Sequence, residues 1–323
     1  MATFITPSFT NSSTISELKE TLCCEGECLP KRFRALFSLK HIATIDQSLP
    51  AIEAIAASFS STSALLKHEV AYCLGQIKNA AAIPYLRTVL MNTAEDPMCR
   101  HEAAEAMGAI GDMQSLIVLR EFRDAVDELT VVRQTCELAI ERILWENGEA
   151  GNEILQTSNF ESIDPAPPTV YEGSVEGLEQ ELLDQKLPLF RRYRAMFSLR
   201  DLASPPDLPT ATAAVLSLAK GFSDPSALFR HEIAFVFGQL SHPASIPALT
   251  SALKNNDEAS MVRHEAAEAL GTLGKQPGVL EILKCFSNDQ DRIVRESVAV
   301  ALDMAEYETS GQTEYALVPE ISA

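Results

Sequence analysis

A repeat with a period of 33 residues runs through the first half of the chain and limits how it can fold. Four basic residues mark the repeat, and each begins a stretch whose apolar residues recur at the i, i+3 and i+4 spacing of a helix. The stretches are RALFSLKHIA from Arg34, KHEVAYCLGQI from Lys67, RHEAAEAMGAI from Arg100 and RQTCELAIERI from Arg133. A shorter amphipathic run, such as AAIPYLRTVLM, precedes each stretch. Because such a helix pair cannot bury its apolar face alone, the pairs must stack on one another.

The second half of the chain repeats the first. RAMFSLR at 194–200 corresponds to RALFSLK at 34–40, and signals for strands are nearly absent throughout. The basic residues that mark the second half are Arg194, Arg230, Arg263 and Arg295. The sequence therefore predicts an all-α fold, an α-solenoid of eight HEAT-type helix pairs in two pseudo-twofold-related halves.

A change of composition separates the two halves. Residues 146–185 contain ten acidic residues and no Lys or Arg, and they include the proline-rich stretch DPAPPTV. We interpret this region as an exposed linker, which would allow the two halves to face each other. The expected division is a flexible leader at 1–16, an N-terminal half at 17–145, the acidic linker at 146–174, a C-terminal half at 175–306 and a tail at 307–323.

Charge and composition exclude several classes of protein. With 26 basic and 45 acidic residues the net charge is −19, which repels nucleic acid and anionic membranes and attracts cationic partners. No stretch is apolar for long enough to cross a membrane, and no secretory signal is evident. The seven cysteines are scattered and odd in number, as is usual for reduced thiols. We therefore expect a cytoplasmic protein, and a monomer.

Four of the six histidines are followed directly by glutamate. The pairs occupy only the two middle repeats of each half and are His68-Glu69, His101-Glu102, His231-Glu232 and His264-Glu265. At the same position the outer repeats carry Ala35-Leu36, Gln134-Thr135, Ala195-Met196 and Glu296-Ser297. A packing requirement of the repeat would apply to the outer repeats as well, so the pattern favours a functional role for the four pairs.

The chemistry of the four pairs points to metal. Equivalent positions on neighbouring stacked helices lie side by side, with about 8–10 Å between the helix axes. His68 and His101 are therefore expected to converge in one half, and His231 and His264 in the other. Imidazole nitrogen and carboxylate oxygen are the ligands of iron, manganese and zinc enzymes, so two facing sets predict two metal ions.

Glycine follows each of these histidines by seven residues, which is nearly two helical turns. The four residues are Gly75, Gly108, Gly238 and Gly271. Glycine inside a helix costs roughly 1 kcal/mol relative to alanine, so its recurrence needs a reason. We interpret the glycines as clearing a slot for a slender substrate beside the metals; the alternative is close helix–helix packing.

The position one turn after each histidine divides the pairs into two kinds. Tyr72 and Phe235 stand there in one kind, and we expect them to be core residues. Glu105 and Glu268 stand there in the other kind. These two glutamates could orient metal ligands, or they could be ordinary solvated helix residues.

With its helical repeats and four His-Glu pairs, the chain resembles the deoxyhypusine hydroxylase family over residues 17–145 and 175–306. The resemblance implies a non-haem di-iron monooxygenase, with two ferrous ions per chain and molecular oxygen as co-substrate. It also implies the substrate, a deoxyhypusine side chain on the precursor of eukaryotic translation initiation factor five-A, a basic protein. Hydroxylation of that side chain would complete hypusine, a post-translational modification.

The resemblance also implies which residues hold the metals. One iron would take His68, His101 and Glu102, and the other would take His231, His264 and Glu265. Glu69 and Glu232 are implied either as further ligands or as groups that hold the amines of the substrate. A long, thin polyamine suits both an acidic protein and a narrow slot between two halves.

Other classes of function remain open from the sequence. A non-catalytic HEAT-type scaffold would use the repeats for binding a partner only. A tetrapyrrole-attaching lyase built from similar short helical repeats would need no iron. A di-zinc hydrolase is a further variant, because the types of ligand do not by themselves exclude zinc.

Overall fold

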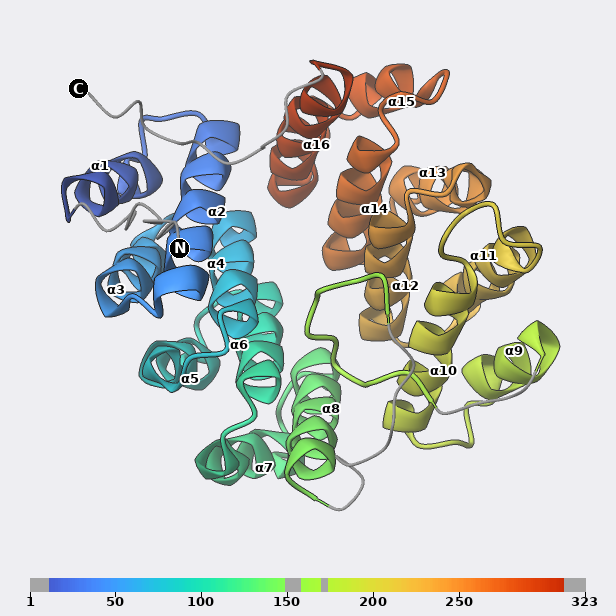
Figure 1. Ribbon diagram of the computed structural model, residues 1–323, viewed down its shortest axis with the longest axis horizontal. Helices are drawn as coiled ribbons and strands as arrows, with labels where there is room; N and C mark the ends of the chain where they lie inside the picture. Colours follow the sequence, from blue (N-terminus) through green and yellow to red (C-terminus); the bar gives the residue numbers. More distant parts are fainter. Residues whose placement is uncertain (1–11, 149–157, 170–173, 311–323) are drawn as a thin grey trace, which may run out of the picture.

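The computed structural model describes residues 12–148, 158–169 and 174–310, and every long regular element in these ranges is an α-helix (Figure 1). The helices are α1 Ser12–Cys23, α2 Leu29–Asp46, α3 Leu49–Ala57, α4 Ala64–Gln76, α5 Ile83–Met91, α6 Pro97–Ile110, α7 Leu116–Asp124, α8 Thr130–Asn147, α9 Val175–Leu183, α10 Leu189–Leu202, α11 Ala211–Ala219, α12 Ala227–Leu240, α13 Ile246–Lys254, α14 Ser260–Thr272, α15 Val279–Cys285 and α16 Arg292–Ser310. Within the described ranges, no helix combines the length and apolar character needed to cross a bilayer.

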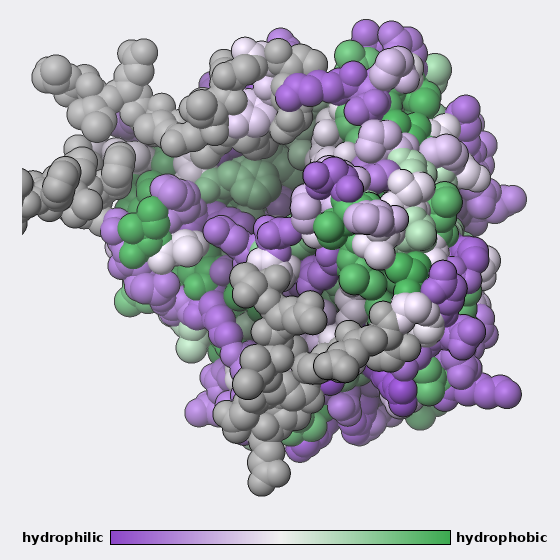
Figure 2. Space-filling model, turned by 45° about the vertical axis from the view of Figure 1, so that its right-hand side comes forward, coloured by the Kyte–Doolittle hydropathy of each residue, from purple (hydrophilic) through white to green (hydrophobic). Residues whose placement is uncertain are grey.

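The helices form two layers around a central space (Figure 1). Even-numbered helices line the inside, where α4 packs on α6, α6 on α8, α12 on α14 and α14 on α16. Odd-numbered helices cover the outside, and the apolar faces of both layers bury a continuous core. The prediction of an all-α solenoid is confirmed. The surface between its apolar patches is largely hydrophilic, and one side of it is hollowed (Figure 2).

The basic residues that mark the repeat include buried groups that join one helix pair to the next. Arg100 donates from Nε to the carbonyl of Leu90 at 3.0 Å, at the end of the preceding outer helix, and from both terminal nitrogens to Glu128. Arg263 makes the equivalent bonds in the second half, and in α10 they come from Arg192, two residues before the repeat mark Arg194. A guanidinium suits this place because it satisfies carbonyls at a helix end and pairs with a carboxylate at once.

Two pseudo-equivalent seams close the inner helices into a ring. At one seam, where α16 meets α2 and α4, the hydroxyl of Ser63 donates to Glu296 at 2.7 Å. At the other, where α8 meets α10 and α12, the hydroxyl of Ser226 donates to Gln134, also at 2.7 Å. Ser63 and Ser226 are the N-cap residues of α4 and α12, so each seam holds the first turn of a helix that carries a His-Glu pair.

Residues 158–169, which we call the strap, cross between the halves (Figure 1). The amide of Gln76 in α4 exchanges two hydrogen bonds with the backbone of Ile163, and Arg200 in α10 forms an ion pair with Asp164 at 2.8 Å. Most strap residues are buried or half-buried, and Ala166 is fully buried. The expectation of an exposed linker is therefore wrong for these residues, because buried partners on both halves bind them. Residues 149–157 and 170–173 lie outside the described ranges.

Helical structure extends beyond the expected limits of both halves. Helix α1 begins at Ser12, so residues 12–16 are helical and not part of a flexible leader. Helix α16 continues to Ser310, so residues 307–310 do not belong to an irregular tail. In α1, Ile15 and Leu18 are buried against the core, which explains why the helix starts early. The remainder of the expected leader and tail lies outside the described ranges.

The recurring glycines mainly allow the inner helices to approach each other. A Cβ atom added at Gly75, Gly108 or Gly271 would lie 2.8–2.9 Å from the Cα of an alanine on the next inner helix. Their interpretation as residues that clear a slot is therefore wrong, because the space that they leave is filled by the neighbouring backbone. Gly238 differs, since a Cβ there would meet Ala269 at an ordinary 3.5 Å, and this glycine does line a cavity.

This contrast gives a matched pair of substitutions. Gly108→Ala should lower the free energy of unfolding by about 1–3 kcal/mol, because α6 and α8 must separate to admit the methyl group. Gly238→Ala should leave stability unchanged or raise it by up to about 1 kcal/mol, because it removes a helix glycine without a clash. Urea unfolding of the metal-free protein measures both changes, and equal losses of stability would contradict the difference in packing.

Candidate metal centre

Four imidazole rings meet at the centre of the ring of helices. They belong to His68 on α4, His101 on α6, His231 on α12 and His264 on α14, and all four residues are buried. Ring centroids lie 5.4 Å apart for the pair in the N-terminal half and 5.3 Å apart for the pair in the C-terminal half. Across the halves, His68 lies 5.1 Å from His264, and His101 lies 5.3 Å from His231. The two halves therefore contribute to one cluster.

Carboxylates complete two related groups of polar atoms. The Oε2 atom of Glu265 lies 3.5 Å from the Nε2 atoms of both His231 and His264, and one atom from each of these residues lies within 4.8 Å of the others. In the N-terminal half, the Oε2 atom of Glu102 lies 3.3 Å from Nε2 of His68.

In the N-terminal half, the possible ligand atoms also form groups that differ from the predicted set of His68, His101 and Glu102. His68 and His101 lie close to His231, and His101 also lies close to Glu102 and Glu105. Rotation of these side chains about a bound ion would decide which combination forms, so the predicted set stays a prediction.

The cluster opens into an acidic cavity of about 220 Å³ between the halves. Glu105 and Glu268 line it, so the alternative of ordinary solvated glutamates is wrong for both. Oε1 of Glu268 lies 3.6 Å from Nδ1 of His264, where it could orient that ring. The six glutamates that line the cavity are Glu69, Glu102, Glu105, Glu232, Glu265 and Glu268.

Burial makes this cluster electrostatically unfavourable when no cation is bound. Desolvation raises the pKa of Glu102 to about 8, and desolvation together with the charge of Glu268 raises the pKa of Glu69 to about 8. Desolvation also lowers the pKa of His101 and His231, and repulsion from the neighbouring imidazoles of the cluster adds to that effect. At neutral pH the imidazoles are therefore uncharged and free to bind metal, while the carboxylates hold protons that a cation would displace.

Buried nitrogen atoms without partners support a metal. Both ring nitrogens of His68 and His101, and Nδ1 of His231 and His264, are buried and have no hydrogen-bond partner within the described chain. A buried polar group without a partner costs about 1–3 kcal/mol, so several such atoms in one cluster require an explanation. Neutral imidazoles beside carboxylates fit a pair of first-row transition metal ions.

Aromatic rings narrow the cavity beyond the carboxylates. Tyr72 and Phe235 line it from opposite halves, with their ring centroids 6.0 Å apart and an angle of 66° between the ring planes. Tyr72 also packs against the core, so the expectation for it holds only in part. The sequence did not single out Phe37 and Lys40, which also line the cavity. Both residues belong to RALFSLK, the stretch that corresponds to RAMFSLR in the second half. This correspondence could have indicated them, because it places them on an inner helix.

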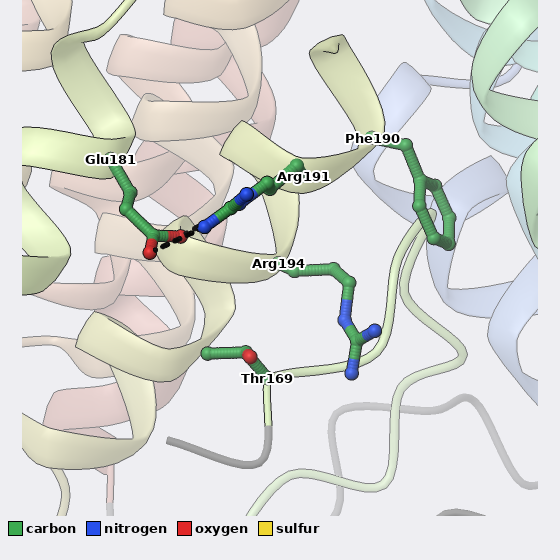
Figure 3. A pocket seen from close by; sticks show the side chains of 5 residues that line it. All are labelled: Thr169, Glu181, Phe190, Arg191 and Arg194. Carbon is green, nitrogen blue, oxygen red and sulfur yellow. Dashed lines mark hydrogen bonds and ion pairs between the residues drawn. The ribbon is translucent and has the colours of Figure 1, made fainter. Parts of the chain in front are cut away.

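A second cavity, of about 420 Å³, lies where α9, α10 and the strap meet (Figure 3). Arg191 pairs with Glu181 at 3.0 Å, and Arg194 donates to the carbonyl of Pro168 at 3.1 Å. The residues that line it are Thr169, Glu181, Phe190, Arg191 and Arg194. Because it shares no lining residue with the acidic cavity, it has no part in the histidine cluster.

Comparison with known proteins assigns the class of the fold and then the family. The sequence model of the HEAT-repeat family matches residues 49–141 and 212–303. The chain is therefore a HEAT-repeat protein, and it has a buried His-Glu cluster at its centre. Proteins named deoxyhypusine hydroxylase are 66% identical to it in Chaetomium globosum and 63% identical in Neurospora crassa. These alignments cover 95% and 97% of this chain, and 92% and 99% of the relatives.

A solved structure agrees with this assignment. The human deoxyhypusine hydroxylase, in complex with glycerol, is 44% identical in sequence and superposes with a TM-score of 0.84. The superposition covers 92% of this chain and 97% of the human one. The chain belongs to the deoxyhypusine hydroxylase family and is an oxidoreductase. This membership favours the hydroxylase over the scaffold and the tetrapyrrole lyase.

The raised carboxylate pKa values predict how stability depends on pH. An unfolded glutamate titrates near 4.5, so between pH 6.5 and 8 the unfolded chain is ionised while Glu69 and Glu102, with pKa values of about 8, still hold protons. The metal-free protein should therefore lose stability as pH rises through this window, with Tm falling by at least about 2 °C. Thermal unfolding at both pH values, with and without bound ferrous iron, measures the effect. Bound metal should reduce the fall, and an equal fall in both forms would contradict the prediction.

Proposed function

We propose that the chain is a non-haem di-iron monooxygenase that hydroxylates the deoxyhypusine side chain of the precursor of eukaryotic translation initiation factor five-A. The product would be hypusine, and molecular oxygen would be the co-substrate. The observation that carries the proposal is the cluster of four buried imidazoles with unpartnered nitrogens, set among carboxylates from both halves. Membership of the family supplies the class of substrate.

In this proposal, one iron is held by His68, His101 and Glu102. The pair His68 and Glu102 already lies at 3.3 Å across neighbouring helices. His231, His264 and Glu265 would hold the second iron, and their ligand atoms are the closest match to a preformed set. When bound, two ferrous ions would supply the activation of oxygen needed to oxidise an unactivated carbon.

The remaining residues of the cavity would bind and orient the substrate. Glu69 and Glu232, which lie beside the ligand histidines, would accept hydrogen bonds from the amine nitrogens of the deoxyhypusine chain. Loss of a proton from each carboxylate as an ammonium group enters would keep the buried charge balanced. Tyr72 and Phe235 would contact the alkyl segment from its two sides and exclude water from it.

The charge of the chain supports a basic protein as the partner. A net charge of −19 gives a field that attracts a cationic protein and speeds its encounter with the cavity. We further propose that the protein works as a monomer in the cytoplasm, and that neither nucleic acid nor a membrane takes part.

Substitution of the glutamates tests the assignment of ligands. Glu102→Ala and Glu265→Ala should each lower the iron content from about two ions per chain to about one or fewer, because each removes an anionic ligand. Glu69→Ala should keep its iron and bind substrate poorly. Elemental analysis after anaerobic reconstitution and desalting measures the metal, and Glu53→Ala, at an exposed site on α3, is the control. Full metal content in both ligand variants would refute the assignment.

Transfer of oxygen tests the reaction itself. Iron-loaded protein should add the mass of one oxygen atom to a deoxyhypusine-bearing substrate protein, with the added atom coming from labelled oxygen gas. Zinc-loaded protein and the His101→Ala variant should not do so, because zinc does not change its redox state and the variant lacks a ligand. Mass spectrometry of the substrate protein reads the result. Hydrolysis of the substrate protein by the zinc-loaded form, with no oxygen incorporated from the labelled gas, would favour the hydrolase over the monooxygenase.

A further inference from the structure

The duplication gives the cavity two pseudo-equivalent sides, and the two sides differ. RALFSLK in α2 corresponds to RAMFSLR in α10, so Phe37 and Lys40 are the counterparts of Phe197 and Arg200. Phe37 and Lys40 are half-buried and line the acidic cavity. Phe197 and Arg200 do not line it, and only 0% and 1% of their surfaces are exposed. Another part of the chain therefore covers the side of Phe197 and Arg200.

The strap covers that side, and Arg200 is its anchor. The guanidinium of Arg200 is stacked against Phe160 of the strap at 4.4 Å and against Phe197 at 4.9 Å, measured to the ring centroids. The same group pairs with Asp164 of the strap at 2.8 Å and donates to Gln239 at 3.0 Å. A buried arginine with these partners holds the strap firmly on the C-terminal half.

Equivalent glutamines tie the strap to both halves. Gln76 ends α4 and exchanges hydrogen bonds of 2.8 Å and 3.1 Å with the backbone of Ile163. Its counterpart Gln239 on α12 donates to the hydroxyl of Ser162 at 2.8 Å. Because α4 and α12 also carry His68 and His231, the strap spans the two helices that bring the halves of the cluster together.

The side of Phe37 and Lys40, which lines the cavity, is suited to an alkyl chain that ends in an ammonium group. The Nζ atom of Lys40 lies 5.3 Å from the ring centroid of Tyr72 and 5.9 Å from that of Phe37. These distances are typical of cation–π contact. A lysine side chain is itself an alkylammonium, so this side of the cavity already holds the kind of group that a polyamine substrate carries. Met304 of α16 adds a flexible apolar wall.

We infer that the strap closes one of the two pseudo-equivalent sides of the cavity, and that the substrate side chain reaches the cluster past Phe37, Lys40 and Met304. The partner protein would therefore dock over α2 and α16, on the side away from Arg200. This inference rests on the proposed function for the identity of the substrate, a protein-borne alkylammonium chain.

Attachment of a bulky group to either side tests the inference. The starting protein is the full chain with the half-exposed Cys23 and the exposed Cys24, Cys28 and Cys285 replaced by serine, because these thiols would also react. Lys40→Cys then adds one accessible thiol on the side of Phe37. Glu161→Cys places one on the exposed surface of the strap and is the matched control. Each variant is reacted with a maleimide that carries a polyethylene glycol chain, and the unreacted protein is its reference.

Two readouts separate the inference from the proposed function. The first is kcat/KM for hydroxylation of the substrate protein by the iron-loaded enzyme, with iron content measured alongside. The second is binding of a peptide that carries a deoxyhypusine side chain to the metal-free protein. If unreacted proteins bind the peptide and fail to hydroxylate it, the proposed function is wrong, while the binding readout still tests the side of access.

Labelled Lys40→Cys should lose at least about tenfold in kcat/KM and in peptide affinity with unchanged iron, whereas labelled Glu161→Cys should stay within about twofold of its reference. A loss with the label on the strap and none with the label at position 40 would overturn the inference. Equal losses would also overturn it, because the strap side would then be open to the substrate.

Discussion

Closure of the inner helices into a ring is the constraint on which the candidate metal centre depends. The repeat position that carries histidine in the middle repeats carries Gln134 or Glu296 in the last repeat of each half. These two residues accept the hydrogen bonds from the N-cap serines of α12 and α4, the helices that bear His231 and His68. The same repeat position thus has two roles. In the middle repeats of each half it supplies the histidines of the site, and in the last repeat of each half it joins that half to the other. Loss of a seam would release the first turn of a helix that bears one of the clustered histidines.

The site itself opposes the stability of the fold. Six carboxylates and four imidazoles are enclosed with Lys40 as the one lysine or arginine among the residues that line the cavity. Each carboxylate would gain free energy by ionising in water, and burial denies it that gain. The surrounding structure must therefore hold the cluster in place, and it does so with close contacts between inner helices and buried arginines that join neighbouring pairs. Such strain at a functional site is usual where a bound cation will relieve it.

The fold and the four histidines were predictable because both depend on a short-range rule repeated many times. A period of 33 residues places equivalent side chains on neighbouring helices, whatever the outer loops do. The glycines were misinterpreted because periodicity places them on the same face as the histidines but does not say how closely the next inner helix approaches, and at three of the four that helix fills the space. Periodicity could not place the strap, because its position depends on Gln76 and Arg200, which are remote from it in sequence. Its acidic composition suggested exposure, yet Asp164 is held inside by a buried guanidinium.

The difference between Lys40 and Arg200 bears on how a symmetric site can treat an asymmetric ligand. Two facing halves of common origin would offer a bound linear molecule two opposite orientations of nearly equal free energy, and each orientation would bring a different carbon to the same place. A ligand attached to a protein at one end has only one free end, so a site with one open side accepts it in a single direction. A single arginine in place of lysine, with a short segment packed over it, is enough to remove the ambiguity that duplication created. Regioselectivity in this enzyme would then originate where the two copies diverged, at some distance from the His-Glu pairs that they still share.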